Sequence, residues 1–147
     1  MTAARGYYTL KSKKFFIYTD GGARGNPGPA GIGAVILDDK KKKVKEISKY
    51  IGEATNNNAE YSALICGLEE AGSLGAAEVV VNLDSELVVK QINGEYRVKN
   101  EEIKPLFKRA IKALKNFKSF EVRHIDRSKN KEADRLANKA INLSSLF

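Results

Sequence analysis

The sequence predicts an α/β domain in which helices pack on a five-stranded mixed sheet. Segments with strand and helix patterns follow one another in the order β-β-β-α-β-α-α-β-α, and the second and third strands are close enough to form an antiparallel hairpin. The chain length of 147 residues is that of about one such domain. We place the domain at residues 14–142, between a flexible N-terminal extension (residues 1–13) and a C-terminal tail (residues 143–147).

The first three strands are expected around a glycine-rich segment. Residues 15–18 are β-prone and are typical of a central strand that ends near Asp20. Residues 21–31 contain five glycines and two prolines, so we expect this whole segment to be loop. Residues 32–37 and 44–51 then form a hairpin around a short polar turn.

Capping and glycine signals delimit the elements in the middle of the chain. The side-chain oxygens of residues 55–58 can cap a helix that runs to about Ala71. Residues 78–83 form an apolar run with one polar residue, which is typical of a strand covered on both faces. A short helix is expected over residues 85–92.

The last third of the chain predicts two amphipathic helices with a strand between them. Pro105 fits the first turn of the first of these helices. Its apolar residues recur at helical spacing: Ile103, Leu106, Phe107, Ala110, Ile111, Leu114 and Phe117. A second face carries what we call the lysine stripe: Lys104, Lys108, Lys112 and Lys115. A fifth strand is expected over residues 119–125, and apolar residues at helical spacing follow in a final helix: Ala133, Leu136, Ala137, Ala140 and Ile141.

The charge of the chain is unevenly distributed. Lys and Arg number 26 against 18 Asp and Glu, a formal net charge of +8, and residues 90–139 hold 15 of the basic and 7 of the acidic residues. This local excess favours a polyanionic partner such as nucleic acid, and the alternative is a basic surface that serves only solubility.

Cysteine, histidine and hydropathy exclude several classes of protein. One Cys and one His provide neither a disulfide framework nor a Cys/His zinc site. The sequence has no apolar run of about 18 residues and no secretory signal, so we expect a cytoplasmic protein with no membrane association.

Four acidic residues stand apart from the others by their positions. Asp20 and Asp84 each end an apolar strand, where a turn or cap role is the alternative to ligand binding. Glu60 lies on the stripe of its helix that is expected to be buried, and a buried carboxylate is costly unless it is paired or binds a metal. Asp134 lies early in the last helix, where it could equally complement the helix dipole.

Carboxylates from separate elements at one end of a sheet need a shared counter-charge. Oxygen ligands alone suit Mg²⁺, with Mn²⁺ as the alternative. With a polyanion as partner, the chemistry that fits is phosphodiester hydrolysis with two metal ions. No P-loop, dinucleotide-binding fingerprint or G-x-S-x-G motif competes with this interpretation.

Four motifs in these places resemble the type 1 ribonuclease H family. They are YTDGGARGNPGPAG (residues 18–31), TNNNAE (55–60), LDS (83–85) and NKEAD (130–134), in the order in which that family carries them. The resemblance covers about residues 14–142. It implies a ribonuclease H fold and an endonuclease that cuts the RNA strand of RNA/DNA hybrids, leaving 5′-phosphate and 3′-hydroxyl ends.

The resemblance also implies roles for individual residues. Asp20, Glu60, Asp84 and Asp134 would be the catalytic, metal-binding carboxylates. The residues that would contact nucleic acid are Ala23, Arg24, Asn26, Thr55, Asn56, Asn57 and Ser85. Glycines let the backbone approach the sugar edge, and the 2′-hydroxyl distinguishes RNA from DNA.

Two departures from the family pattern affect the site. Members often carry a His on the loop before the last carboxylate; here His124 belongs to the strand pattern, and we assign the equivalent place to Arg127, with His124 as the alternative. The Trp-rich basic protrusion of some members is replaced by a short segment without Trp. We therefore expect Arg97, Lys99 and the lysine stripe to bind the hybrid.

The sequence is also compatible with other functions. One is a non-catalytic nucleic-acid-binding module on the same fold; another is a related nuclease that also cuts double-stranded RNA, or a domain taken from a reverse transcriptase. We expect a monomer with no obligate protein partner.

Overall fold

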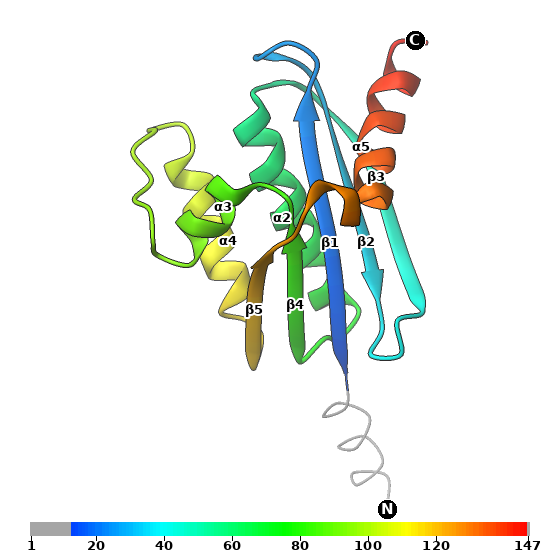
Figure 1. The fold of residues 1–147 in the computed structure, drawn as a ribbon, viewed down its shortest axis with the longest axis vertical. Helices are drawn as coiled ribbons and strands as arrows, with labels where there is room; N and C mark the ends of the chain where they lie inside the picture. Colours follow the sequence, from blue (N-terminus) through cyan, green and yellow to red (C-terminus); the bar gives the residue numbers. More distant parts are fainter. Residues whose placement is uncertain (1–12, 147) are drawn as a thin grey trace, which may run out of the picture.

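The computed structural model describes residues 13–146 as one sheet with helices on both faces (Figure 1). Residues 1–12, which make up most of the predicted N-terminal extension, and residue 147 of the predicted tail lie outside the described residues. The strands are β1 (Lys14–Ala23), β2 (Gly28–Leu37), β3 (Lys43–Ala54), β4 (Glu78–Leu83) and β5 (Ser119–His124). The helices are α2 (Asn56–Ser73), α3 (Glu86–Ile92), α4 (Lys104–Leu114), the 3₁₀ turn η1 (Arg127–Lys129) and α5 (Lys131–Ser144).

The sheet has the strand order β3-β2-β1-β4-β5. The pairs β1–β2 and β2–β3 are antiparallel, whereas β4 runs parallel to both β1 and β5. This confirms the predicted five-stranded mixed sheet. Because β1 lies between an antiparallel and a parallel neighbour, its carboxyl end lies beside the carboxyl end of β4.

The prediction that residues 21–31 are entirely loop is wrong. β1 continues to Ala23 and β2 begins at Gly28, and the two strands pair through Gly22 with Gly31 and Ala23 with Ala30. Glycine weakens a strand because it loses more backbone entropy on folding than other residues, but pairing of this end of β1 with β2, and of β2 with β3, supplies hydrogen bonds that offset the cost. Only four residues, 24–27, remain as the connection.

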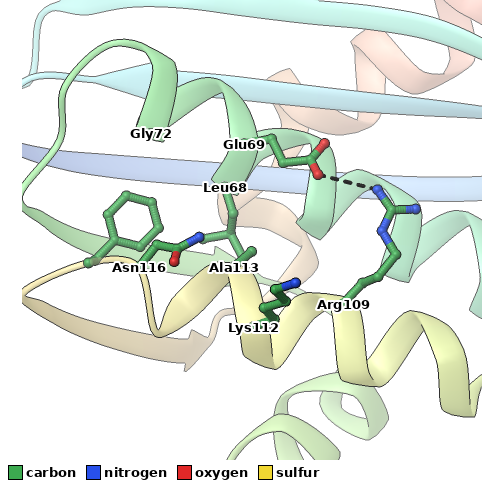
Figure 2. Close-up of a pocket in the computed structure, with 8 residues that line it drawn as sticks. Leu68, Glu69, Gly72, Arg109, Lys112, Ala113 and Asn116 are labelled. Atoms are coloured by element: carbon green, nitrogen blue, oxygen red, sulfur yellow. Dashed lines mark hydrogen bonds and ion pairs between the residues drawn. The ribbon is translucent and has the colours of Figure 1, made fainter.

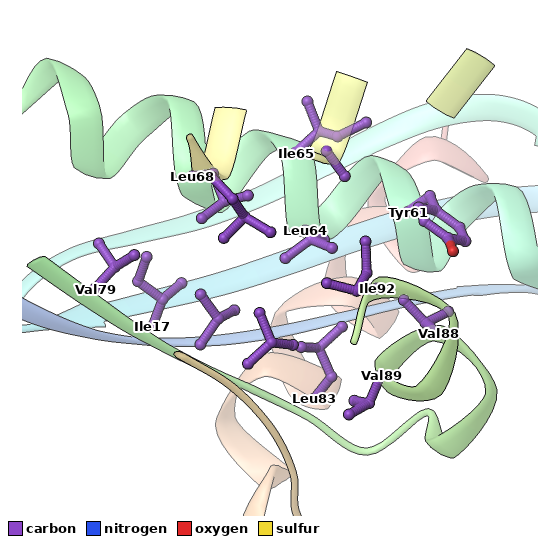
Figure 3. Close-up of a cluster of buried hydrophobic side chains, with 14 of the residues drawn as sticks. Ile17, Tyr61, Leu64, Ile65, Leu68, Val79, Leu83, Val88, Val89 and Ile92 are labelled. Carbon is purple, nitrogen blue, oxygen red and sulfur yellow. The ribbon is translucent and has the colours of Figure 1, made fainter. Parts of the chain in front are cut away.

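The main core fills the space between one face of the sheet and α2, α3 and α4 (Figure 3). Ile17 and Val81 extend from the sheet to meet Leu64 of α2 and Val88 of α3, and all four side chains are fully buried. A bond from the Tyr61 hydroxyl to Gln91 Oε1 (2.7 Å) links α2 to α3. The segment after β4 is therefore held close to the start of α2.

The opposite face of the sheet is covered by α5, which packs directly on glycines of β2. A Cβ atom on Gly33 would collide with the carbonyl oxygen of Ala133, and one on Gly31 would collide with that of Ala137. At these two glycines the backbone of α5 therefore rests directly on the backbone of β2.

The ends of the described chain extend beyond the predicted domain limits. α5 runs to Ser144, two residues into the predicted tail. Lys13, the last residue of the predicted extension, donates from Nζ to the Leu74 carbonyl (2.9 Å). Within residues 13–146 we find no helix whose length and apolar character would let it cross a membrane.

Candidate active site

Three carboxylates from separate elements meet at the carboxyl ends of β1 and β4. Asp20 comes from β1, Glu60 from the second turn of α2, and Asp84 follows β4 directly. One oxygen atom from each lies within 4.8 Å of the corresponding atoms of the other two. All three side chains are half-buried, so they are open to a small ligand from solvent.

The fourth predicted acid, Asp134, approaches this group from the other face of the sheet. Asp20 pairs with Gly33, and the backbone of Ala133 lies over Gly33. The next residue of α5 therefore brings its carboxyl group into the same hollow as Asp20, close enough to raise the pKa of Asp20. The carboxylates whose oxygen atoms lie within 4.8 Å of one another are those of Asp20, Glu60 and Asp84, and Asp134 lies beside this group.

The local electrostatics favour a cation at this place. Burial, followed by repulsion from Asp84, raises the pKa of Asp20 to about 8 from its ordinary 3.8, and Asp134 and Glu60 add to the effect. Burial likewise raises the pKa of Glu60, against a hydrogen bond from Ser85 and the charge of Arg127, which lower it. Clustered carboxylates with raised pKa values and only oxygen donors fit a hard divalent cation.

The structure places Arg127, and not His124, beside the carboxylates. Arg127 begins the turn η1, and its charge acts on Glu60. It lines a hollow that also includes Asp20, Glu60 and Asp134. His124 ends β5 as an exposed residue and does not line that hollow.

The predicted contact residues around the glycine-rich turn partly hold one another. The Asn56 side chain accepts a hydrogen bond from the Ala23 amide (2.8 Å), and the Asn56 amide donates to Asn26 Oδ1 (3.0 Å). Thr55 Oγ1 caps α2 by accepting from the Asn58 amide. These bonds fix the β1–β2 turn against the start of α2, beside the carboxylates.

The remaining predicted contact residues lie at different distances from this site. The Ser85 hydroxyl caps α3 and lines a small hollow together with Asp20, Glu60 and Asp84, so it belongs to the carboxylate group. Asn57 is half-buried in the first turn of α2. Arg97 and Lys99 are exposed on the long connection between α3 and α4 (Figure 1).

Sequence reasoning did not assign a site role to Asn130. This residue is only 1% exposed, and its Nδ2 donates to Asp84 Oδ2 (3.0 Å) and to the Thr19 carbonyl (2.9 Å). An Asn immediately before a predicted helix has the signature of an N-cap, so the pattern alone could not separate it from an ordinary cap.

A second hollow lies between α2 and α4 (Figure 2). Its rim carries Arg109, which pairs with Glu69 (3.3 Å), and Lys112 of the lysine stripe, while Leu68 and Phe117 form part of its wall. Glu69 lies nine residues after Glu60, about 13 Å along the α2 axis. This hollow is therefore separate from the carboxylate site.

Comparisons with known proteins cover the elements that carry the carboxylates. A family model described as reverse transcriptase-like matches residues 18–140. Ribonuclease HI of Halobacterium salinarum is 40% identical over 124 residues, which are 84% of this chain and 62% of that protein. The chain belongs to the ribonuclease H family.

Two further members of the ribonuclease H family are similar over most of this chain. A bifunctional protein of Mycobacterium tuberculosis is 44% identical over 133 residues, 90% of this chain. The crystal structure of the ribonuclease H1 called LC11, in complex with an RNA/DNA hybrid, is 47% identical with a TM-score of 0.84 and covers 88% of this chain and 98% of that one. The chain spans 36% of the mycobacterial protein and 62% of the halobacterial one.

Proposed function

We propose that this chain is an endonuclease that hydrolyses the RNA strand of RNA/DNA hybrids and leaves 5′-phosphate and 3′-hydroxyl ends. The observation that carries the proposal is the convergence of Asp20, Glu60 and Asp84 within 4.8 Å. A group that only bound phosphates would gain nothing from this concentration of negative charge. The likeness to LC11 ribonuclease H1, whose structure contains a hybrid, supports the choice of substrate.

The cofactor we propose is Mg²⁺, with Mn²⁺ as the alternative. Asp20, Glu60 and Asp84 would hold it, and Asp134 would complete the ligand set from α5. When bound, such ions activate the attacking water and stabilise the leaving oxygen. The Ser85 hydroxyl, which lines the same hollow as Glu60 and lowers its pKa, would stabilise the ionised form of that carboxylate.

Arg127 would serve the negatively charged substrate. It is exposed, it lines the same hollow as three of the carboxylates, and it keeps its charge at any working pH. An arginine can attract and orient a phosphate but cannot shuttle a proton at neutral pH. We therefore assign Arg127 to phosphate binding rather than to general acid or base catalysis.

We propose that the β1–β2 turn and the start of α2 meet the RNA strand. The residues concerned are Ala23, Arg24, Asn26, Thr55, Asn56, Asn57 and Ser85. Hydrogen bonds of Asn56 with Ala23 and Asn26 hold the turn against the start of α2, so these three residues are positioned before substrate arrives. Arg97, Lys99 and the lysine stripe would add phosphate contacts farther along the hybrid.

We also propose that the protein works as a monomer in the cytoplasm with no obligate protein partner. The four carboxylates all come from one chain, so the proposed chemistry does not require a second subunit.

Purified protein with end-labelled substrates tests the proposal. Hybrid, double-stranded RNA and double-stranded DNA of one sequence are incubated with Mg²⁺, with Mn²⁺ or with EDTA. We expect cutting of the RNA strand of the hybrid with metal and none with EDTA. Tight binding without cutting would favour a non-catalytic module instead, and equal cutting of double-stranded RNA would broaden the substrate class.

A further inference from the structure

We propose that Asn130 is a positioning residue that sets the relative places of three of the four carboxylates. The inference rests on the proposed function and concerns a residue that does not itself bear a charge. The buried Asn130 side chain and its backbone make three contacts: to β1, to the residue that follows β4, and to α5.

The first two contacts come from the carboxamide nitrogen. Nδ2 donates one hydrogen bond to Asp84 Oδ2 (3.0 Å) and a second to the carbonyl of Thr19 (2.9 Å), the residue before Asp20. Both partners are hydrogen-bond acceptors, so the Asn130 amide must present its nitrogen to them. Turning the amide by 180° would place Oδ1 against the Thr19 carbonyl oxygen and Asp84 Oδ2, where no hydrogen bond could form. The two protons of one NH₂ group thus join the end of β1 to the acid that follows β4.

The third contact comes from the backbone. The Asn130 carbonyl accepts from the amide of Asp134 (3.1 Å), which is the first intrahelical bond of α5. Asn130 therefore touches the segment that carries each of Asp20, Asp84 and Asp134. Glu60 alone is placed by other means, through the helix α2 that begins at Thr55.

The Asn130 side chain makes these contacts instead of capping α5. It occupies the N-cap position of α5, where an Asn side chain normally accepts from an amide of the first turn, but it makes no side-chain capping bond. Its Oδ1 atom is buried and has no hydrogen-bond partner within the described residues. A buried, unpaired oxygen is a cost that a purely structural cap would avoid.

A second buried asparagine, in the sheet, provides a matched control. Asn82 of β4 is also buried (4% exposed), and its Nδ2 also donates to a β1 carbonyl, that of Ile17 (3.3 Å). Among the bonds of its side chain that the structure shows, none reaches a carboxylate. Replacing Asn82 removes a similar bond without touching the site.

The test compares Asn130→Asp, Asn130→Ala and Asn82→Ala with the unsubstituted protein. Asp has nearly the size of Asn but cannot donate, so Asn130→Asp removes both donors with little change in volume. Because it also adds a negative charge beside the proposed cation site, it is assessed through kcat. The readouts are Mn²⁺ binding by calorimetry without substrate, and kcat and KM on a labelled hybrid. Asn130→Ala removes both donors without adding a charge, so it carries the Mn²⁺ comparison. If Asn130→Ala does not fold, the kcat of Asn130→Asp still tests the assignment.

We expect Asn130→Ala to bind Mn²⁺ more weakly and both Asn130 variants to lose kcat, each by about 10- to 100-fold, with KM for the hybrid little changed. Asn82→Ala should unfold at a lower temperature but keep the Mn²⁺ affinity of the unsubstituted protein. Full Mn²⁺ affinity and kcat in Asn130→Ala, full kcat in Asn130→Asp, or an equal loss of affinity in Asn82→Ala would overturn the assignment. Failure of the unsubstituted protein to bind Mn²⁺ or to cut hybrid would instead overturn the proposed function.

Discussion

Replacing Asp20 with asparagine should stabilise the metal-free protein while abolishing cleavage. Asp20 is packed against Asp84, Asp134 and Glu60, and burial together with this repulsion raises its pKa to about 8. In the unfolded chain the carboxyl group ionises near its ordinary pKa of 3.8. The folded state therefore binds a proton that the unfolded state has already lost, and folding becomes less favourable as the pH rises between these values.

The size of the effect follows from the two pKa values. Each pKa unit corresponds to about 1.4 kcal/mol, so the difference between 3.8 and about 8 sets a ceiling of about 6 kcal/mol near pH 8. The side chain is only half-buried, and solvent screening reduces this to about 2–3 kcal/mol. For a chain of this length, that corresponds to a rise in Tm of about 5–10 °C.

Thermal unfolding in EDTA measures this directly. Near pH 8 the Tm of Asp20→Asn should exceed that of the unsubstituted protein, and the gap should close as the pH falls toward about 4, where the carboxyl group is protonated in both states. Millimolar Mg²⁺ should raise the Tm of the unsubstituted protein and have much less effect on the variant. Asp39→Asn, which removes an exposed acid from the β2–β3 turn, is the control and should change the Tm little.

A Tm for Asp20→Asn at or below that of the unsubstituted protein in EDTA near pH 8 would refute the reasoning. It would mean that the carboxylates do not repel one another, and with that the physical case for a shared cation would be lost.

The other predictions concern cleavage and binding. Asp84→Asn should lower kcat by at least about 1,000-fold while hybrid binding persists, as a gel-shift titration would show; substantial residual cutting would contradict its role as a ligand. Arg127→Ala should lower the steady-state rate of cleavage by about 10-fold or more, and His124→Ala by less than about 2-fold. The reverse order would assign the place of the family's loop histidine to His124 instead of Arg127. Lys108→Glu with Lys112→Glu should weaken hybrid binding and reduce its dependence on salt, whereas an unchanged salt slope would reduce the lysine stripe to a solvated surface.

The sequence was most informative where a residue type conflicts with its expected environment. A carboxylate on the buried stripe of a helix and two at the ends of apolar strands carry a cost that a ligand would remove, and the structure brings Asp20, Glu60 and Asp84 together. The order of strands and helices was equally accessible, because apolar spacing and glycine signals mark most boundaries.

Long-range contacts limited what could be predicted. The glycine-rich segment was interpreted as loop because local propensity cannot show that β1 and β2 pair through Ala23 and Ala30. Asn130 was missed for the same reason, since its partners Thr19 and Asp84 lie 111 and 46 residues away. Its local signature is that of a cap, and only the fold shows where its amide points.

Main-chain contact between β1 and α2 beside the site fixes the distance between two of its acids. Gly21 follows Asp20, and a Cβ at that position would collide with the carbonyl of Ala59, the residue before Glu60. The spacing between these two acids is thus set by main chain resting on main chain. Side chains of the core between sheet and helices can be exchanged for others of similar volume without changing that spacing. The geometry of the site can in this way stay constant while core side chains are substituted.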